Sequence, residues 1–199
     1  MERLSGNFQQ DVRTLDALLG VERSFDMIAR DLVAGGRRCR IWVVDGYGDD
    51  AVIERIVSFL LAQRTTADAH SAQEFIDHYV TFSEVNAETD VEQALTAVFL
   101  GKTLLLAEGF SSCILIDAKS YRSRGVEEPS SGKVLRGAHD GFIETLVQNA
   151  ALLRRRIRTP QLTLEGHKIS ENSRADVALC YLEDKVDRAL LERVRTKLA

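Results

Sequence analysis

Four aspartates have the spacing of a candidate metal site. Asp45, Asp49 and Asp50 follow the apolar segment "CRIWVV", and Asp117 follows "CILI". Both segments are predicted strands, and carboxylates placed at strand ends are common Mg²⁺ ligands in α/β proteins that transfer phosphoryl groups. The alternative is structural, because Asp49 or Asp50 can cap the following helix and Asp45-Gly46 can form a tight turn. The sequence is compatible with both roles, but the cap and the turn require no further residues.

Other catalytic patterns are missing from the sequence. The segment "LGKT" resembles the end of a phosphate-binding loop, but Thr96 occupies the position of its first glycine and a strand follows it. The three cysteines lie far apart in apolar segments, which is typical of buried thiols in a reducing compartment. The four histidines share no metal-ligand spacing with them. We therefore expect no enzyme activity, no cofactor and no bound metal.

Four arginines occupy five positions in "RRRIR", residues 154–158. Apolar residues precede and interrupt this run at helical spacing, at positions Ile143, Leu146, Ala150, Leu153 and Ile157. At about 100° per residue, Arg154, Arg155 and Arg156 point to three different faces, which suits neither a nucleic-acid groove nor a membrane surface. The net charge of −4 also argues against nucleic acid. Arginines in a last turn complement the helix dipole, and Arg154, beside the apolar stripe, is expected to contact the core or a neighbouring subunit.

Periodicity predicts a mixed α/β (α+β) fold. We expect helices over residues 8–20, 49–64, 71–80, 90–101, 141–158 and 186–198. We expect a hairpin around Gly35-Gly36, and further strands over residues 81–85, 103–109, 112–118, 161–169 and 175–183.

Two small subdomains are expected. The segment "RGVEEPSSGKVLRG" is rich in glycine, serine and charge, and it coincides with a change from a net acidic to a net basic sequence. We place an N-terminal subdomain at 1–124 and a second one at 125–199, with a linker at 125–140, the helix 141–158 and then a β-β-α remainder. That remainder is expected to be part of a larger, truncated unit. The sequence has no export signal and no apolar run long enough for a membrane span.

The region around the arginines resembles a known family. The segment "RGAHDGFIETLVQNAALLRRRIRTPQL" is similar to the signature of the GerA family of spore germination receptor A subunits. The matching residues are Arg136, Gly137, Asp140, Gly141, Phe142, Glu144, Asn149, Leu152 and Arg154 to Ile157. The segments "LGVERSFDMIARDL", "GGRRCRIWVVDGY" and "EGFSSCILIDA" most resemble the stage V sporulation protein AF branch of that family. The sequence departs from the pattern at Ala138-His139 and at "YLED".

The resemblance implies a function without catalysis. The chain would be the N-terminal regulatory or assembly region of an oligomeric protein of the inner spore membrane that forms or regulates an ion channel. It would face the cytosol of the spore core, contact other subunits of the same complex, bind no nucleic acid and reach the membrane only through a missing C-terminal part. Contacts between subdomains or subunits are expected from Arg136, Asp140, Phe142, Glu144, Asn149, Arg154, Arg155 and Arg156.

Two other functions stay open at this point. One is a small-molecule binding module with its ligand in a cleft between the subdomains. The other is a Mg²⁺-dependent phosphoryl-transfer enzyme that uses Asp45, Asp49 and Asp117.

Overall fold

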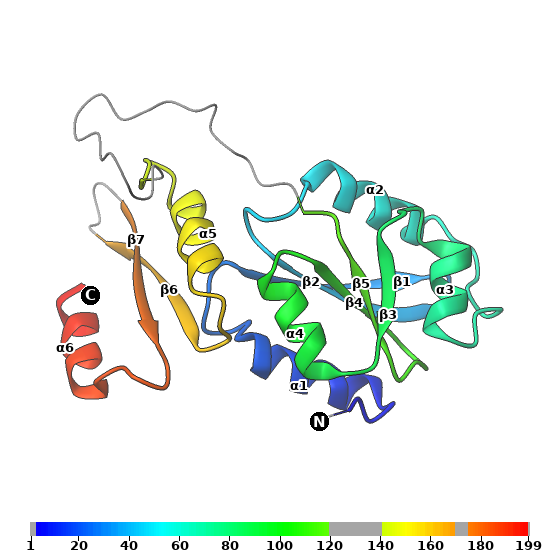
Figure 1. The fold of residues 1–199 in the computed structure, drawn as a ribbon, viewed down its shortest axis with the longest axis horizontal. Helices are drawn as coiled ribbons and strands as arrows, with labels where there is room; N and C mark the ends of the chain where they lie inside the picture. The colour runs from blue at the N-terminus through cyan, green and yellow to red at the C-terminus, as the bar shows by residue number, and fades with distance from the viewer. Residues whose placement is uncertain (1–2, 120–140, 170–174, 199) are drawn as a thin grey trace.

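The computed structural model describes residues 3–119, 141–169 and 175–198 (Figure 1). It contains two antiparallel sheets, and helices pack against both. The helices are α1 (Phe8–Leu19), α2 (Asp50–Leu61), α3 (Ala72–Tyr79), α4 (Val91–Phe99), α5 (Leu146–Arg156) and α6 (Arg188–Leu198). The strands are β1 (Met27–Ala34), β2 (Arg37–Val44), β3 (Val85–Glu88), β4 (Thr103–Ala107), β5 (Cys113–Ile116), β6 (Leu162–Ile169) and β7 (Ala175–Leu182). The mixed α+β class predicted from the sequence is confirmed.

Helices cover both faces of the larger sheet, whose strand order is β1-β2-β4-β5-β3. Side chains alternate between the faces, so Ile41 and Leu105 pack with α2 and α3, whereas Trp42 and Leu104 pack with α1 and α4. The central strands β4 and β5 are buried along their whole length. We call residues 3–119 the five-stranded unit.

The helix ends in this unit follow the caps expected from the sequence. α1 ends at Gly20, which adopts the left-handed conformation with φ of 73°. The Asp49 carboxylate accepts hydrogen bonds from the first backbone N–H groups of α2, and Asp90 does the same for α4. The hairpin between β1 and β2 turns at Gly35 and Gly36, as predicted.

The second group of elements, residues 141–169 and 175–198, is called the two-stranded unit. Its strands β6 and β7 pair antiparallel, and α5 packs on them through Ala150, Leu162 and Leu164 (Figure 1). α6 is attached by a bidentate ion pair between Arg195 and Glu165, with Nε–Oε1 at 2.9 Å and Nη2–Oε2 at 2.5 Å. A two-stranded sheet is marginally stable alone, so these helices and the contact with the five-stranded unit must stabilise it. The predicted boundary at 124/125 and the linker 125–140 lie outside the described residues.

Two predicted elements begin several residues later than expected. The strand expected at 81–85 is β3 at Val85–Glu88, because pairing with β5 begins at Val85 opposite Ile116. Polar side chains alternate along β3, which weakened its apolar signal. The helix expected at 141–158 is shorter, at Leu146–Arg156.

The late start of α5 has a clear cause. The Asn149 side chain accepts a hydrogen bond from the Ile143 backbone N–H at 2.7 Å and donates one to the Ile143 carbonyl at 2.6 Å. This pair of bonds, which we call the Asn149 clamp, holds residue 143 outside the helix. Ile143 therefore belongs to the preceding segment and not to the helical stripe. Within the described ranges, none of the helices has the length and apolar character needed to cross a membrane.

Candidate functional site at the joint between the two units

A buried ion pair joins the two units. Arg154 on α5 and Asp26, just before β1, are 1% and 0% exposed. The Arg154 Nε lies 2.5 Å from one Asp26 carboxylate oxygen, and its Nη2 lies 2.8 Å from the other. Two parallel N–H···O bonds of this kind are the strongest arrangement of a guanidinium and a carboxylate, and they fix the angle between the partners.

The remaining donors of Arg154 bind neighbouring segments. Nη2 also donates to the Ser24 hydroxyl at 3.3 Å, and Nη1 donates to the Leu162 carbonyl at 3.3 Å. The guanidinium lies over the Phe99 ring of α4, 5.4 Å from its centroid. One side chain thus links α5, β6, α4 and the chain entering β1.

Backbone bonds reinforce the joint from the side of β6. The Phe25 N–H donates to the Leu164 carbonyl at 3.0 Å, and the Leu164 N–H donates to the Ser24 hydroxyl at 3.1 Å. The Phe25 ring packs on Gly166, where an added Cβ would lie 3.3 Å from Phe25. The two-stranded unit is therefore held by directional bonds as well as by apolar contact.

The turn after β2 supports α5. Gly46 has φ of +78°, and a Cβ built on it would lie 3.2 Å from the Ala151 Cβ and 3.3 Å from a Val147 methyl carbon. The helix can approach the turn backbone this closely because the residue has no side chain. The Asp45 N–H donates to the Asp26 carbonyl at 2.7 Å, which ties the same turn to the ion pair.

Asp45 has an unfavourable environment for a carboxylate. Burial raises the pKa of its carboxyl, and the negative charges of Asp50 and Asp26 raise that pKa further. A hydrogen bond from the Gly46 backbone N–H acts in the opposite direction. Burial and, to a smaller extent, two neighbouring carboxylates thus both disfavour the charged form of Asp45.

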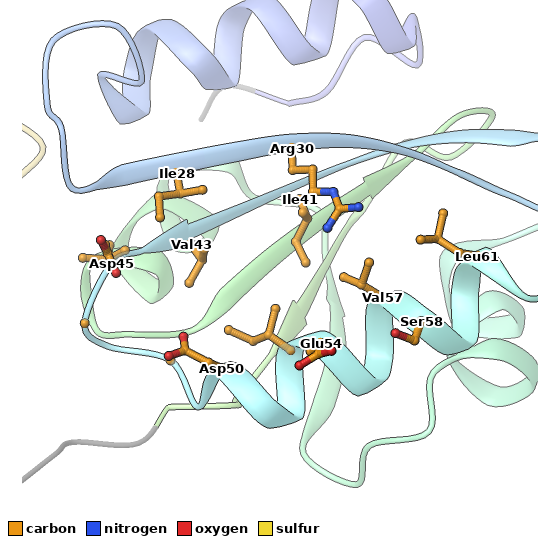
Figure 2. A pocket seen from close by; sticks show the side chains of 14 residues that line it. Ile28, Arg30, Ile41, Val43, Asp45, Asp50, Glu54, Val57, Ser58 and Leu61 are labelled. Carbon is orange, nitrogen blue, oxygen red and sulfur yellow. The ribbon is translucent and has the colours of Figure 1, made fainter.

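A groove lies on the other side of this turn. It has a volume of about 470 Å³ and runs between the β1–β2 hairpin and α2 (Figure 2). Apolar side chains line most of it, with Arg30, Asp45, Asp50 and Glu54 as its charged lining residues. All of its lining residues lie between positions 28 and 61, so it is not the cleft between subdomains that the sequence suggested.

The sequence-predicted contact residues divide into three groups. Arg154 contacts the other unit directly, and Asn149 shapes the segment before α5. Phe142 and Glu144 are exposed on that segment, Arg155 is half-buried and Arg156 is exposed. Arg136 and Asp140 lie outside the described residues.

The aspartates of the metal hypothesis do not form a ligand cluster in the described part of the chain. Asp49 caps α2. Asp117 forms an ion pair with Lys119 at 2.8 Å. The helix cap that was the structural alternative in the sequence thus accounts for Asp49, whereas the ion pair of Asp117 was not predicted.

Sequence reasoning missed Asp26 and Ser24. They lie at the start of the predicted hairpin, where the pattern of residues 25–33 fits a strand or a short helix equally well, and Asp26 lies 128 positions from Arg154. The only local signal was an arginine beside an apolar stripe, which predicts a buried partner without naming it.

Comparison with known proteins places the chain in a family. Residues 14–199 match the family described as Bacillus/Clostridium GerA spore germination protein. Stage V sporulation protein AF of Bacillus subtilis (strain 168) is 32% identical over 182 residues, which is 91% of this chain and 37% of that protein. Spore germination protein GerLA of Bacillus cereus is 25% identical over 198 residues, covering 98% of this chain and 40% of that protein. The chain thus spans about two fifths of the length of these relatives.

A solved structure shares the fold. The crystal structure of the N-terminal domain of the A subunit of the Bacillus megaterium spore germinant receptor GerK3 superposes with a TM-score of 0.77 at 20% identity. The match covers 99% of this chain and 72% of that one. Both sheets and the helices around them therefore belong to an architecture already seen in a germinant receptor subunit.

Proposed function

The chain belongs to the GerA family of spore germination proteins, and we propose that it is the regulatory and assembly domain of an A-subunit-type membrane protein of that family. In this proposal the domain faces the cytosol of the spore core, performs no catalysis, and couples neighbouring subunits to an ion-conducting membrane part. Its partners are further copies of the same chain and other germination membrane proteins.

The buried pair of Asp26 and Arg154 supports this proposal most directly. A regulatory domain must transmit a displacement, and a bidentate bond between two fully buried groups resists a change of angle between the units it joins. The Gly46 contact with α5 adds a second point of attachment. Two attachments prevent the rotation that a single bond would allow.

In this proposal, residues on α5 and on the preceding segment make the contacts between units and between subunits. Arg154 holds the units together, while Arg155 and Arg156 follow in the last turn of α5 and supply polar contacts for assembly. In the same proposal, Arg136 and Asp140 contribute contacts of this kind from the preceding part of the signature.

Charge reversal at Arg155 tests the assembly role. We expect Arg155→Glu in the full-length protein to reduce co-purification with partner subunits from detergent-solubilised membranes, while the folding transition of the domain stays within about 1 kcal/mol of wild type. Arg193→Glu on the exposed side of α6 is the matched control and should not affect assembly. Unchanged assembly together with an unchanged fold in Arg155→Glu would exclude the contact role.

A further inference from the structure

The groove between the β1–β2 hairpin and α2 has the size and the walls of a small-molecule site. Its volume of about 470 Å³ lies within the range of about 300–1,000 Å³ that is usual for such sites. Aliphatic side chains of the hairpin and of α2 form its two walls (Figure 2): Ile28, Ile41, Val43, Ile53, Val57 and Leu61. The groove can therefore hold the apolar body of a small organic molecule.

The charged side chains of the groove favour a cation. Among its lining residues, Asp45, Asp50 and Glu54 are acidic and Arg30 is basic, so the lining has a formal charge of −2. Neither Asp45 nor Glu54 forms an ion pair with any residue that the structure describes. A positively charged group in the groove would supply the missing counter-charge, whereas an anion would add to the repulsion.

Asp45 indicates where the charged group of such a ligand would lie. Its side chain is half-buried at the turn end of the groove, whereas Arg30 is exposed (Figure 2). Water and salt screen a half-buried charge less than an exposed one, so Asp45 acts on an occupant more strongly than Arg30 does. Burial and the neighbouring carboxylates of Asp50 and Asp26 raise the pKa of Asp45, and a perturbed carboxyl in an apolar pocket is typical of binding sites.

We propose that this groove binds a small organic cation, with a protonated amine beside Asp45 and an apolar body between the aliphatic walls. Glu54 adds a second carboxylate on the helix side, and Arg30 acts against the cation. Alkylamines and arylalkylamines are the ligand class that combines these two parts. The inference goes beyond the proposed assembly function and does not depend on it, because all lining residues belong to the five-stranded unit.

Three probes of similar size and different charge test the proposal. 2-Phenylethylamine is protonated at pH 7, as the lysine amine is, 2-phenylethanol is neutral, and 3-phenylpropanoate is an anion. Each is titrated into the ¹⁵N-labelled 199-residue chain and followed by the NMR signals of the backbone N–H groups. We expect the amine to bind with a Kd of about 1 mM, the alcohol about tenfold more weakly, and the anion not measurably.

The position of the shifts identifies the site. Addition of the amine should shift the backbone N–H signals of Gly46 and Gly48, which line the turn end of the groove. A second groove of about 480 Å³, between α1 and β1, provides a control in the same molecule, because its lining includes the basic residues Arg13 and Arg38. The signal of Val12, which lines this second groove, should stay unchanged.

Substitutions in the lining separate charge from shape. Asp45→Asn should weaken amine binding by about fivefold and Glu54→Gln by about twofold, whereas Arg30→Gln should strengthen it by about twofold. Ser58→Trp fills the groove without changing its charge and should abolish binding of the amine and the alcohol alike. Ser58 is exposed, so this substitution leaves the fold intact.

Several results would overturn the proposal. They are equal binding of the amine and the alcohol, tighter binding of the anion, shifts centred on the α1–β1 groove, and no shifts at about 10 mM amine. Unchanged amine binding in Asp45→Asn would also refute the assigned position of the charged group. Because binding is measured on the isolated chain, any of these results leaves the proposed assembly function standing, and a failure of assembly in Arg155→Glu leaves the ligand site standing.

Discussion

Arg154 is the residue on which the joint between the two units depends. Removing two charges from water costs several kcal/mol, and only the bidentate geometry and the bonds to Ser24 and Leu162 offset this cost. An apolar pair of equal size could stabilise the joint as well. We therefore infer that the pair is most important for geometry, because it permits a single orientation of α5 relative to the start of β1.

Asp45 gives a prediction about pH. Because its pKa is raised in the fold, the stability it contributes is fully present below the unfolded pKa of about 3.9 and is lost as pH rises through the folded pKa. Asp45→Asn keeps the oxygen that accepts from Gly46 but never ionises. We expect its thermal midpoint to lie above that of wild type at pH 7, and the difference to vanish below about pH 3.5.

The matched control for Asp45 is Asp176→Asn on β7, an exposed carboxylate. Its thermal midpoint at pH 7 should stay close to that of wild type, because an exposed side chain contributes little to stability. If the Asp45→Asn advantage were the same at pH 3.5 and pH 7, charge burial would not be its cause.

At the scale of elements, the contact between α5 and the 45–48 turn can be tested by comparing alanine substitutions at two glycines. Gly46 and Gly36 both have positive φ, at +78° and +86°, so alanine is strained at either position. Only at Gly46 would a Cβ press on α5, since nothing lies within 4 Å of a Cβ at Gly36. We expect Gly36→Ala to lose about 1–2 kcal/mol of unfolding free energy and Gly46→Ala to lose clearly more, measured by urea denaturation. Equal losses would show that α5 does not depend on this turn.

The elements that the sequence predicted well are those encoded by neighbouring residues. Caps such as Asp49 and Gly20 act within one turn of their helix, and the Gly35-Gly36 hairpin is set by the backbone freedom of two residues. The start of α5 was wrong because Asn149, a residue inside the helix, binds the backbone of Ile143 six positions earlier. Periodicity reports which face of a helix is apolar, but it contains no information about such a side-chain bond.

For the molecule as a whole, the 45–48 turn connects two surfaces. Asp45, Gly46 and Gly48 line the groove on one side of the turn, and Gly46 packs against α5 on the other. An occupant of the groove would therefore contact the turn that supports α5 and, through the Asp45 N–H, the backbone of Asp26. The groove lining and the segments that hold the two-stranded unit are therefore in direct contact through this one turn.

The last prediction concerns how the two units unfold. Trp42, the single tryptophan, reports on the five-stranded unit, and a dye on Cys180 reports on β7. Labelling is selective because Cys39 and Cys113 are 1% exposed and burial raises the pKa of each thiol to about 12. In wild type we expect both signals to change at the same denaturant concentration, since the buried ion pair and the Phe25–Leu164 bond join the units.

Arg154→Met should separate the two transitions. The substitution leaves Asp26 buried without its partner, which costs about 3–5 kcal/mol, and the small two-stranded unit, which depends on the joint, should unfold at lower denaturant than the Trp42 transition. Asp26→Asn combined with Arg154→Met removes the unpaired charge, so it should recover part of the lost stability without making the transitions coincide again. If Arg154→Met instead shifted both signals together by the same amount, the units would be coupled by their apolar contacts, and the ion pair would not be the element that transmits force between them.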